Sequence, residues 1–203
     1  MPEKDELLES TEDETAEPTR SGGDDENDTE EEDNDMPETN TVGKLKRGAL
    51  IHYVDASFGG SAAAWSLIGA DVEDMSVELN PDTETIKNIL DETSVVDTGY
   101  SPSFDVDTYY ADPSNGDFYT KIKNIAMNRL TGDECKTKVL EVIVDKTTGP
   151  FDAWVEDVIV KPTSYGGAQG GVRIPYTVTF CGNRVPGTAT LTANKVPTFT
   201  ATT

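Results

Sequence analysis

The sequence holds a single histidine, His52, which limits the catalytic chemistry open to the chain. A Ser-His or Cys-His site needs a histidine exposed beside its nucleophile, but His52 lies in the apolar run 50–54, where we expect a structural role. The motif Gly-x-Ser-x-Gly is also missing, because the stretches that begin at Gly59 and Gly99 lack the final glycine. We therefore expect no enzyme and no catalytic residue, although counting alone does not exclude a glycosidase-like carboxylate pair.

Cysteine is almost as scarce, with Cys135 and Cys181 the only two. Two distant cysteines and one histidine do not form a zinc-binding pattern. The acidic run 80–91 has the spacing of a calcium-binding loop, but Thr85 stands where such a loop needs glycine. No cofactor and no metal are therefore expected. Both cysteines are predicted to be reduced and buried, as in a cytosolic protein.

Long apolar runs are absent and basic residues are few. The first residues are acidic and no apolar stretch follows them, so we expect no secretory signal, and the longest apolar runs are too short to cross a bilayer. Only 16 Lys and Arg residues oppose 39 Asp and Glu residues. This balance disfavours tight binding of nucleic acid but is compatible with a surface past which nucleic acid slides.

Acidic residues are abundant, and many of them lie in the first forty positions. That segment has 18 acidic and two basic residues, about −16 of the formal charge of −23, and it has no Val, Ile, Phe, Trp or Tyr. Such a segment cannot bury enough surface to offset its chain entropy, so residues 1–42 are predicted to be a disordered acidic arm. We expect a solvating segment; repulsion of nucleic acid and docking on a basic partner are the alternatives.

Residues 43–203 are predicted to be one β-rich domain, long enough to bury a core. Apolar and polar residues alternate in many of its segments, as is typical of half-buried strands. Strands are expected at residues 50–54, 65–68, 75–79, 103–108, 138–144, 153–160, 172–180, 188–193 and 197–201. Residues 81–91 fit either a helical face or an extended hairpin or loop, and their threonines favour the extended form. Only Glu141 interrupts the apolar run 139–144, so that strand is either central or covered by a partner.

One helix is expected after the turn-forming residues 112–117. Asp117 is its predicted N-cap and Gly132 its predicted end, and its apolar face consists of Phe118, Ile122, Ile125 and Ala126. The glycine-rich stretch 166–171 lacks the Lys-Ser/Thr of a phosphate loop and is interpreted as a hairpin connection, or as a loop that adapts to a neighbouring subunit. The predicted fold class is mainly β, a β-sandwich or barrel with one flanking α-helix, preceded by the disordered arm.

Several stretches of the domain, spread over nearly all of residues 45–203, together form a pattern that is compared below with a known family. The main segment runs from Asp71 to Tyr110, and the most informative stretches are Glu78-Leu79-Asn80-Pro81-Asp82-Thr83-Glu84-Thr85, Gly99-Tyr100-Ser101-Pro102, Ile125-Ala126-Met127-Asn128-Arg129, Pro162-Thr163-Ser164-Tyr165-Gly166-Gly167 and Gly182-Asn183-Arg184-Val185-Pro186-Gly187. As an overall pattern these residues resemble the major tail tube protein of long-tailed bacteriophages and prophages. The acidic arm lies outside the family pattern.

The resemblance implies a structural virion protein without catalytic residues, whose subunits form hexameric rings that stack into a tail tube. A closed β-barrel built by six chains would line the tube, and DNA would pass through it during ejection. The implied partners are further copies of the chain, the tape measure protein, the tail terminator and the distal tail protein, with no membrane insertion. The implied location is the virion tail, after assembly in the cytoplasm of the host bacterium. Residues 81–98 and 111–117 are candidate contacts between subunits or rings.

A different class of function is a β-sandwich binding module of a virion or cell surface, which would recognise a carbohydrate or a protein. Such a module is expected to expose clustered aromatic side chains. The only local concentration of aromatic residues consists of Tyr100, Phe104, Tyr109 and Tyr110.

Deleting residues 1–42 should leave the melting temperature within a few degrees of that of the full chain, because a charged disordered segment contributes no buried area. Thermal unfolding of both forms, followed by circular dichroism, checks this. Loss of cooperative unfolding in the shortened chain would show that the arm is part of the fold.

Overall fold

The computed structural model describes residues 43–69, 72 and 74–202. The predicted acidic arm, residues 1–42, lies outside the described residues. Within them the chain is mainly strand with one α-helix, which confirms the predicted fold class. None of the helices in these ranges is long and apolar enough to span a membrane.

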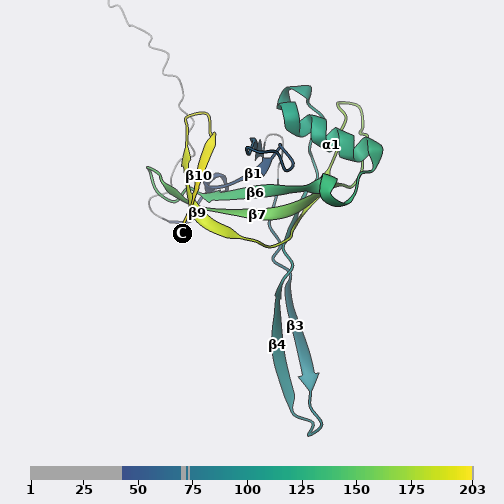
Figure 1. The fold of residues 1–203 in the computed structure, drawn as a ribbon, viewed down its shortest axis with the longest axis vertical. Coiled ribbons are helices and arrows are strands. Elements are labelled where there is room, and N and C mark those ends of the chain that lie inside the picture. Colours follow the sequence, from purple (N-terminus) through teal and green to yellow (C-terminus); the bar gives the residue numbers. More distant parts are fainter. Residues whose placement is uncertain (1–42, 70–71, 73, 203) are drawn as a thin grey trace, which may run out of the picture. The chain divides into compact units, whose positions relative to one another are not determined.

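Ten strands, three short 3-10 helices and one α-helix make up the described chain (Figure 1). In chain order they are η1 (Arg47–Ala49), β1 (Leu50–Asp55), β2 (Trp65–Ile68), β3 (Pro81–Lys87), β4 (Thr93–Tyr100), β5 (Ser103–Val106), η2 (Pro113–Asn115), α1 (Gly116–Asn128), η3 (Gly132–Cys135), β6 (Lys136–Ile143), β7 (Phe151–Pro162), β8 (Tyr176–Phe180), β9 (Val185–Leu191) and β10 (Pro197–Ala201).

Eight of these strands form one antiparallel sheet, with the order β10-β9-β7-β6-β1-β2 and a branch made by β8 and β5. The branch arises at β7, which is 12 residues long. One edge of β7 pairs with β6. The other edge pairs with β9 over residues 151–155 and with β8 over residues 158–162. The sheet therefore divides along β7 into two parts.

Strand β6 lies between β1 and β7, and both of its faces are buried. Val139 packs into one hydrophobic cluster, whereas Leu140 and Val142 pack into the other. Alternate residues of a strand point to opposite faces, so a central strand covered on both sides needs a nearly continuous apolar run. Of the two alternatives, a central strand or one covered by a partner, the structure shows the central strand.

The helix α1 covers one face of the sheet and forms the helix-side core. Its predicted apolar face is buried, and Phe118, Ile122 and Ala126 pack with sheet residues that include Val158 and Val160 of β7. Phe118 also meets Tyr176 of β8 edge to face, with ring centroids 5.6 Å apart. The helix is thus held by burial of its amphipathic stripe rather than by capping.

The opposite face of the sheet carries a second cluster, the opposite core, which joins strands from both ends of the strand order. Ile51 and Tyr53 of β1 pack there with Ala189 of β9 and with the partly buried Phe199 of β10. The Tyr53 hydroxyl donates a 2.7 Å hydrogen bond to the carbonyl of Lys195, in the turn between β9 and β10. Burying one face from strands this far apart requires the sheet to curl.

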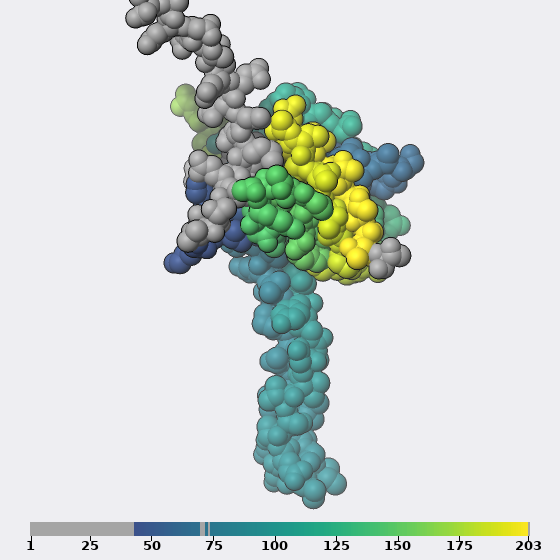
Figure 2. Space-filling view, turned by 90° about the vertical axis from the view of Figure 1, so that its left-hand side faces the viewer, coloured from purple at the N-terminus to yellow at the C-terminus, as the bar shows by residue number. Residues whose placement is uncertain are grey.

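Strands β3 and β4 form a separate two-stranded sheet, which confirms the preference for a hairpin at residues 81–91. All of their residues are exposed except Gly99, which is half-buried. Figure 2 shows the visible side of this hairpin, drawn in teal, with no other described segment covering it. The hairpin therefore contributes almost nothing to either core.

Three predicted strands are shorter in the structure than the alternation suggested, and one of them is β5, which ends at Val106 rather than at residue 108. Within residues 75–79 only Glu78 makes a strand-like bridge, to Ser103, so the prediction of a full strand there is wrong. Strand β8 begins at Tyr176 rather than at residue 172. Pro175 has no N–H to donate to a ladder, and Arg173 forms isolated bridges to Tyr110 and Gly166 instead.

The predicted caps of the helix are also wrong. The N-cap is Asn115, without a side-chain hydrogen bond, and Asp117 lies inside the first turn. The capping aspartate of this region is Asp112, which accepts from the Ser114 amide and starts the preceding turn η2. The helix ends at Arg129, whose φ of 51° is left-handed, whereas Gly132 opens η3.

The cysteines differ from each other, which corrects the prediction that both are buried. Both are free, and Cys135 is buried at the end of η3, but Cys181 is exposed. Strand β8 ends at Phe180, which is buried, so the next residue falls in the loop outside the core.

Replacing Ile122 with alanine should destabilise the protein by about 2–5 kcal/mol, because Ile122 is completely buried in the helix-side core and the change leaves a cavity. Met127→Ala on the exposed side of the same helix is the matched control and should cost less than about 0.5 kcal/mol. Urea unfolding of both variants measures the difference. Equal, small losses would show that the helix does not carry this part of the core.

Candidate functional site

Two polar residues stand opposite each other in the most apolar strands of the sheet. His52 of β1 and Glu141 of β6 are direct partners in the strand register. Nε2 of His52 lies 3.3 Å from Oε1 of Glu141. Both residues are buried, with exposed fractions of 2% and 8%. His52, which interrupts the apolar run of β1, is therefore the cross-strand neighbour of Glu141, which interrupts the apolar run of β6.

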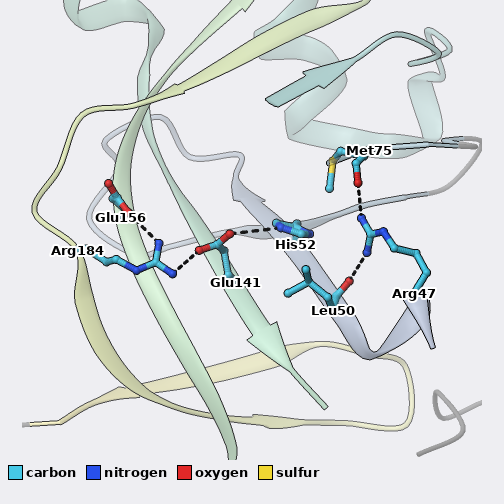
Figure 3. Close-up of polar contacts among 7 residues, drawn as sticks. All are labelled: Arg47, Leu50, His52, Met75, Glu141, Glu156 and Arg184. Atoms are coloured by element: carbon cyan, nitrogen blue, oxygen red, sulfur yellow. Dashed lines mark hydrogen bonds and ion pairs between the residues drawn. The ribbon is translucent and has the colours of Figure 1, made fainter. Parts of the chain in front are cut away.

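An arginine from the loop between β8 and β9 completes this network (Figure 3). Arg184 lies 2.6 Å from Glu141 and 2.9 Å from Glu156 of β7. Its guanidinium also lies over the ring of Trp154, 5.4 Å from the centroid. Two buried carboxylates on neighbouring strands thus share one half-exposed cation. We name His52, Glu141, Glu156 and Arg184 the buried charge network.

The surroundings favour the ionised forms of Glu141 and Arg184. Burial raises the pKa of Glu141, but the His52 imidazole and the Arg184 guanidinium outweigh it and hold the pKa below its ordinary value of 4.5. Burial lowers the pKa of Arg184, yet Glu156 and Glu141 together raise it above the ordinary value. A carboxylate in the interior remains charged because a fixed cation accompanies it.

The described contacts of the network join β1, β6 and β7 to the loop between β8 and β9. Nδ1 of His52 is buried and has no hydrogen-bond partner among the described residues. The described residues also contain no group of three His, Cys, Asp or Glu side chains placed to hold a metal ion. The structural role of His52 stays a prediction, and the structure places this residue in β1, buried and next to Glu141.

The acidic run 80–91 and the glycine-rich stretch 166–171 have structural explanations. Asp82 and Glu84 lie in β3, paired to β4, rather than around a loop. A Cβ at Gly167 would lie 2.2 Å from the carbonyl oxygen of Gly171, so only glycine allows this close approach. The stretch lies within the connection between β7 and β8, which pair with each other, and the interpretation as a hairpin connection is confirmed.

The aromatic residues that a binding module would expose do not form a surface cluster. Phe104 and Tyr109 are buried in the helix-side core. Tyr110 is half-buried and engaged by Arg173, whose guanidinium lies 4.8 Å from the ring centroid and donates to the Tyr110 hydroxyl. Of these four aromatic residues, only Tyr100 is largely exposed.

The strongest surface feature is the hairpin β3–β4. Large apolar side chains are exposed along it and just before it, namely Leu79, Ile86, Ile89, Leu90, Val95, Val96 and Tyr100. In the register of the hairpin Ile86 and Val96 share one face, whereas Val95 lies on the other. Several large exposed apolar side chains on one element are typical of an interaction site. The other predicted contact segment, residues 111–117, is exposed from Asp112 onward.

Comparison with known proteins gives distant structural likenesses. No protein-family model matches the chain, and no curated protein sequence matches it. A sheath/tube terminator of an extracellular contractile injection system, in its extended state, has 10% identity and a TM-score of 0.44 over 72% of this chain and 99% of its own. The tail tube of SPP1 has 15% identity and a TM-score of 0.46 over 70% of this chain and 78% of its own. At these values the two structures assign no family to this chain.

Replacing Arg184 with alanine should destabilise the protein by about 1–3 kcal/mol, because two buried carboxylates lose their cation. The lowered pKa of Glu141 contributes stability that is present above pH 4.5 and is lost as the pH falls through the folded-state value. The variant should therefore also unfold at a higher pH during acidification. Urea unfolding between pH 3 and pH 7 measures both effects.

Lys136→Ala is the matched control, since it removes an exposed ion pair with Asp133. Its effect should stay below about 1 kcal/mol. If Arg184→Ala behaves like Lys136→Ala over the whole pH range, the network contributes nothing to stability.

Proposed function

We propose that this chain is a structural subunit that assembles into hexameric rings, and that the rings stack into a tail tube through which DNA leaves a phage-type particle. The observation that carries the proposal is the hairpin β3–β4, which keeps its apolar residues exposed within the subunit. The choice of a tail tube, rather than another assembly, rests on the resemblance of residues 45–203 to tail tube proteins. Two features of the sheet support it further.

The first feature is the set of sheet edges that lack a second strand. Strands β2, β10 and β5 each have a single strand partner in the described sheet, and Ser103 of β5 adds one isolated bridge to Glu78. Unpaired edge groups favour addition of a strand from another chain, and closure into a ring is one way to satisfy them. A curled sheet with open edges therefore suits a barrel to which several subunits contribute.

The second feature is an uncharged polar face on β9 and β10. Thr188 pairs with Thr200 and Thr190 with Thr198, while Ala189 and Phe199 between them belong to the opposite core. The nearby cation Arg184 is neutralised by Glu141 and Glu156. Threonine hydroxyls carry no charge and displace no counterions from DNA, so such a face suits a wall past which DNA slides.

Assembly should accelerate as salt increases. Beyond residue 40 the chain has 21 acidic and 14 basic residues, about −7, so like copies repel each other. The Debye length falls from about 30 Å at 0.01 M salt to about 10 Å at 0.1 M, and this screening leaves the apolar contacts to act. Light scattering across a salt series, with electron microscopy of the products, is the test.

The expected products are rings or hollow tubes. Protein that remains monomeric at every salt and protein concentration would contradict the proposal. So would tight binding of duplex DNA by the purified chain, because a conduit must release the DNA that it conducts.

A further inference from the structure

The tip of the hairpin is a defined structure rather than a loose loop. Oδ1 of Asn88 accepts hydrogen bonds from the amides of Leu90 and Glu92, at 2.9 and 3.0 Å. The Asn88 amide donates to the carbonyl of Glu92, and Lys87 pairs with Asp91. These bonds hold two apolar side chains outward: Ile89 is fully exposed and Leu90 is 73% exposed.

A cavity of about 310 Å³ lies elsewhere on the subunit, at the ends of β1 and β2. Much of its wall is apolar and includes Ile51, Leu67, Ile68 and Met75. Arg47 and Lys195 also line it, and no carboxylate is among its described lining residues. A ligand that carries apolar side chains next to a negatively charged group is complementary to an apolar wall with two cations.

Backbone contacts hold the Arg47 guanidinium in place and anchor the main chain of Lys195. The Arg47 guanidinium donates to the carbonyls of Leu50 and Met75, at 2.7 and 2.9 Å, as Figure 3 shows. The Lys195 backbone is anchored through its carbonyl by the Tyr53 hydroxyl. The acceptors of these two bonds are neutral carbonyls, so the bonds position the charge of Arg47 without neutralising it.

The tip has the complementary character. The carboxylate of Asp91 is paired with Lys87. Among the described residues, the carboxylate of Glu92 accepts only from the side-chain amide of Asn88, which is neutral. The tip therefore keeps a negative charge beside Ile89 and Leu90. The tip is also exposed in the same subunit in which the cavity is open, so it does not occupy its own cavity. The matching occupant is the tip of another copy.

We propose that the hairpin tip of one subunit inserts Ile89 and Leu90 into the cavity between Arg47 and Lys195 of a second copy. The inference rests on the proposed self-assembly and assigns the two surfaces that make the contact. The surfaces differ, so the contact is heterologous. Each copy then has one tip and one cavity to offer, and such contacts continue from copy to copy instead of ending at a dimer.

Cysteine cross-linking of the polymerised full chain tests the contact. Leu90→Cys and Leu67→Cys are combined in a chain with Cys181→Ser, which removes the exposed native thiol. Mild oxidation should give a ladder of covalent multimers on a denaturing gel, because each subunit is joined to two others. The matched control, Glu84→Cys with Leu67→Cys, places the first thiol in β3 away from the tip and should give no ladder.

Polymers without a ladder would overturn this inference and leave the proposed function standing. A cross-link from Met36→Cys to Leu67→Cys, with none from Leu90→Cys, would also overturn it, because the acidic arm would then be the occupant. If no polymer forms at all, the proposed function fails and the inference fails with it.

Charge exchange provides a second readout. At low salt Glu92→Lys should raise the protein concentration needed for assembly about tenfold, because like charges then meet at the contact. Adding Lys195→Glu to the same chain should restore most of the loss, whereas the exposed Lys146→Glu should not. Circular dichroism verifies that each variant is folded. Equal effects of Lys195→Glu and Lys146→Glu would contradict the assignment of the cavity.

Discussion

The divided pairing of β7 is the constraint on which the described fold depends. One edge of this strand pairs with β6, and the other changes partner from β9 to β8 along its length. The part toward Pro162 carries Val158 and Val160 into the helix-side core, and the part that begins at Phe151 carries Ala153 into the opposite core. A single strand thereby links two hydrophobic clusters on opposite faces of the sheet. The packing of the helix and the curl of the sheet follow from that arrangement.

The buried charge network lies where these parts meet. Glu156 belongs to the middle of β7, Glu141 to its neighbour β6, and Arg184 to the loop that leads from β8 to β9. An ion pair buried in this way is weak support for stability by itself, but it penalises any register that separates its members. Shifting β6 by one residue would turn Glu141 into the opposite core, without its cation. The network therefore selects one register for the three central strands.

Much of the fold follows from local patterns in the sequence. Strands β2 and β10 have the predicted bounds, and the four predicted apolar residues of the helix are buried. The predictions fail where contacts with residues distant in the sequence determine whether a segment becomes a strand. Residues 75–79 alternate like a strand, yet they find only one bridge, at Glu78.

The candidate site was less accessible to sequence reasoning. Glu141 stood out as the one charge in an apolar run and His52 as the one polar residue in another. Their pairing depends on the register of β1 with β6, which no local pattern gives. Arg184 comes from a loop 43 positions after Glu141 and carries no local signal at all. The hairpin was predicted as an extended segment, but its complete exposure depends on the absence of any described segment packed against it.

The central claim of the proposal is that the chain is one part of a ring, since its hairpin and the outer edges of β2 and β10 have no further strand partner among the described residues. The most direct measurement is electron cryo-microscopy of the purified full chain after it has been concentrated at about 0.1 M salt, where surface charge is screened. The account predicts end-on views with sixfold symmetry around an open centre. Particles of single-chain size alone, or closed dimers without a channel, would contradict it.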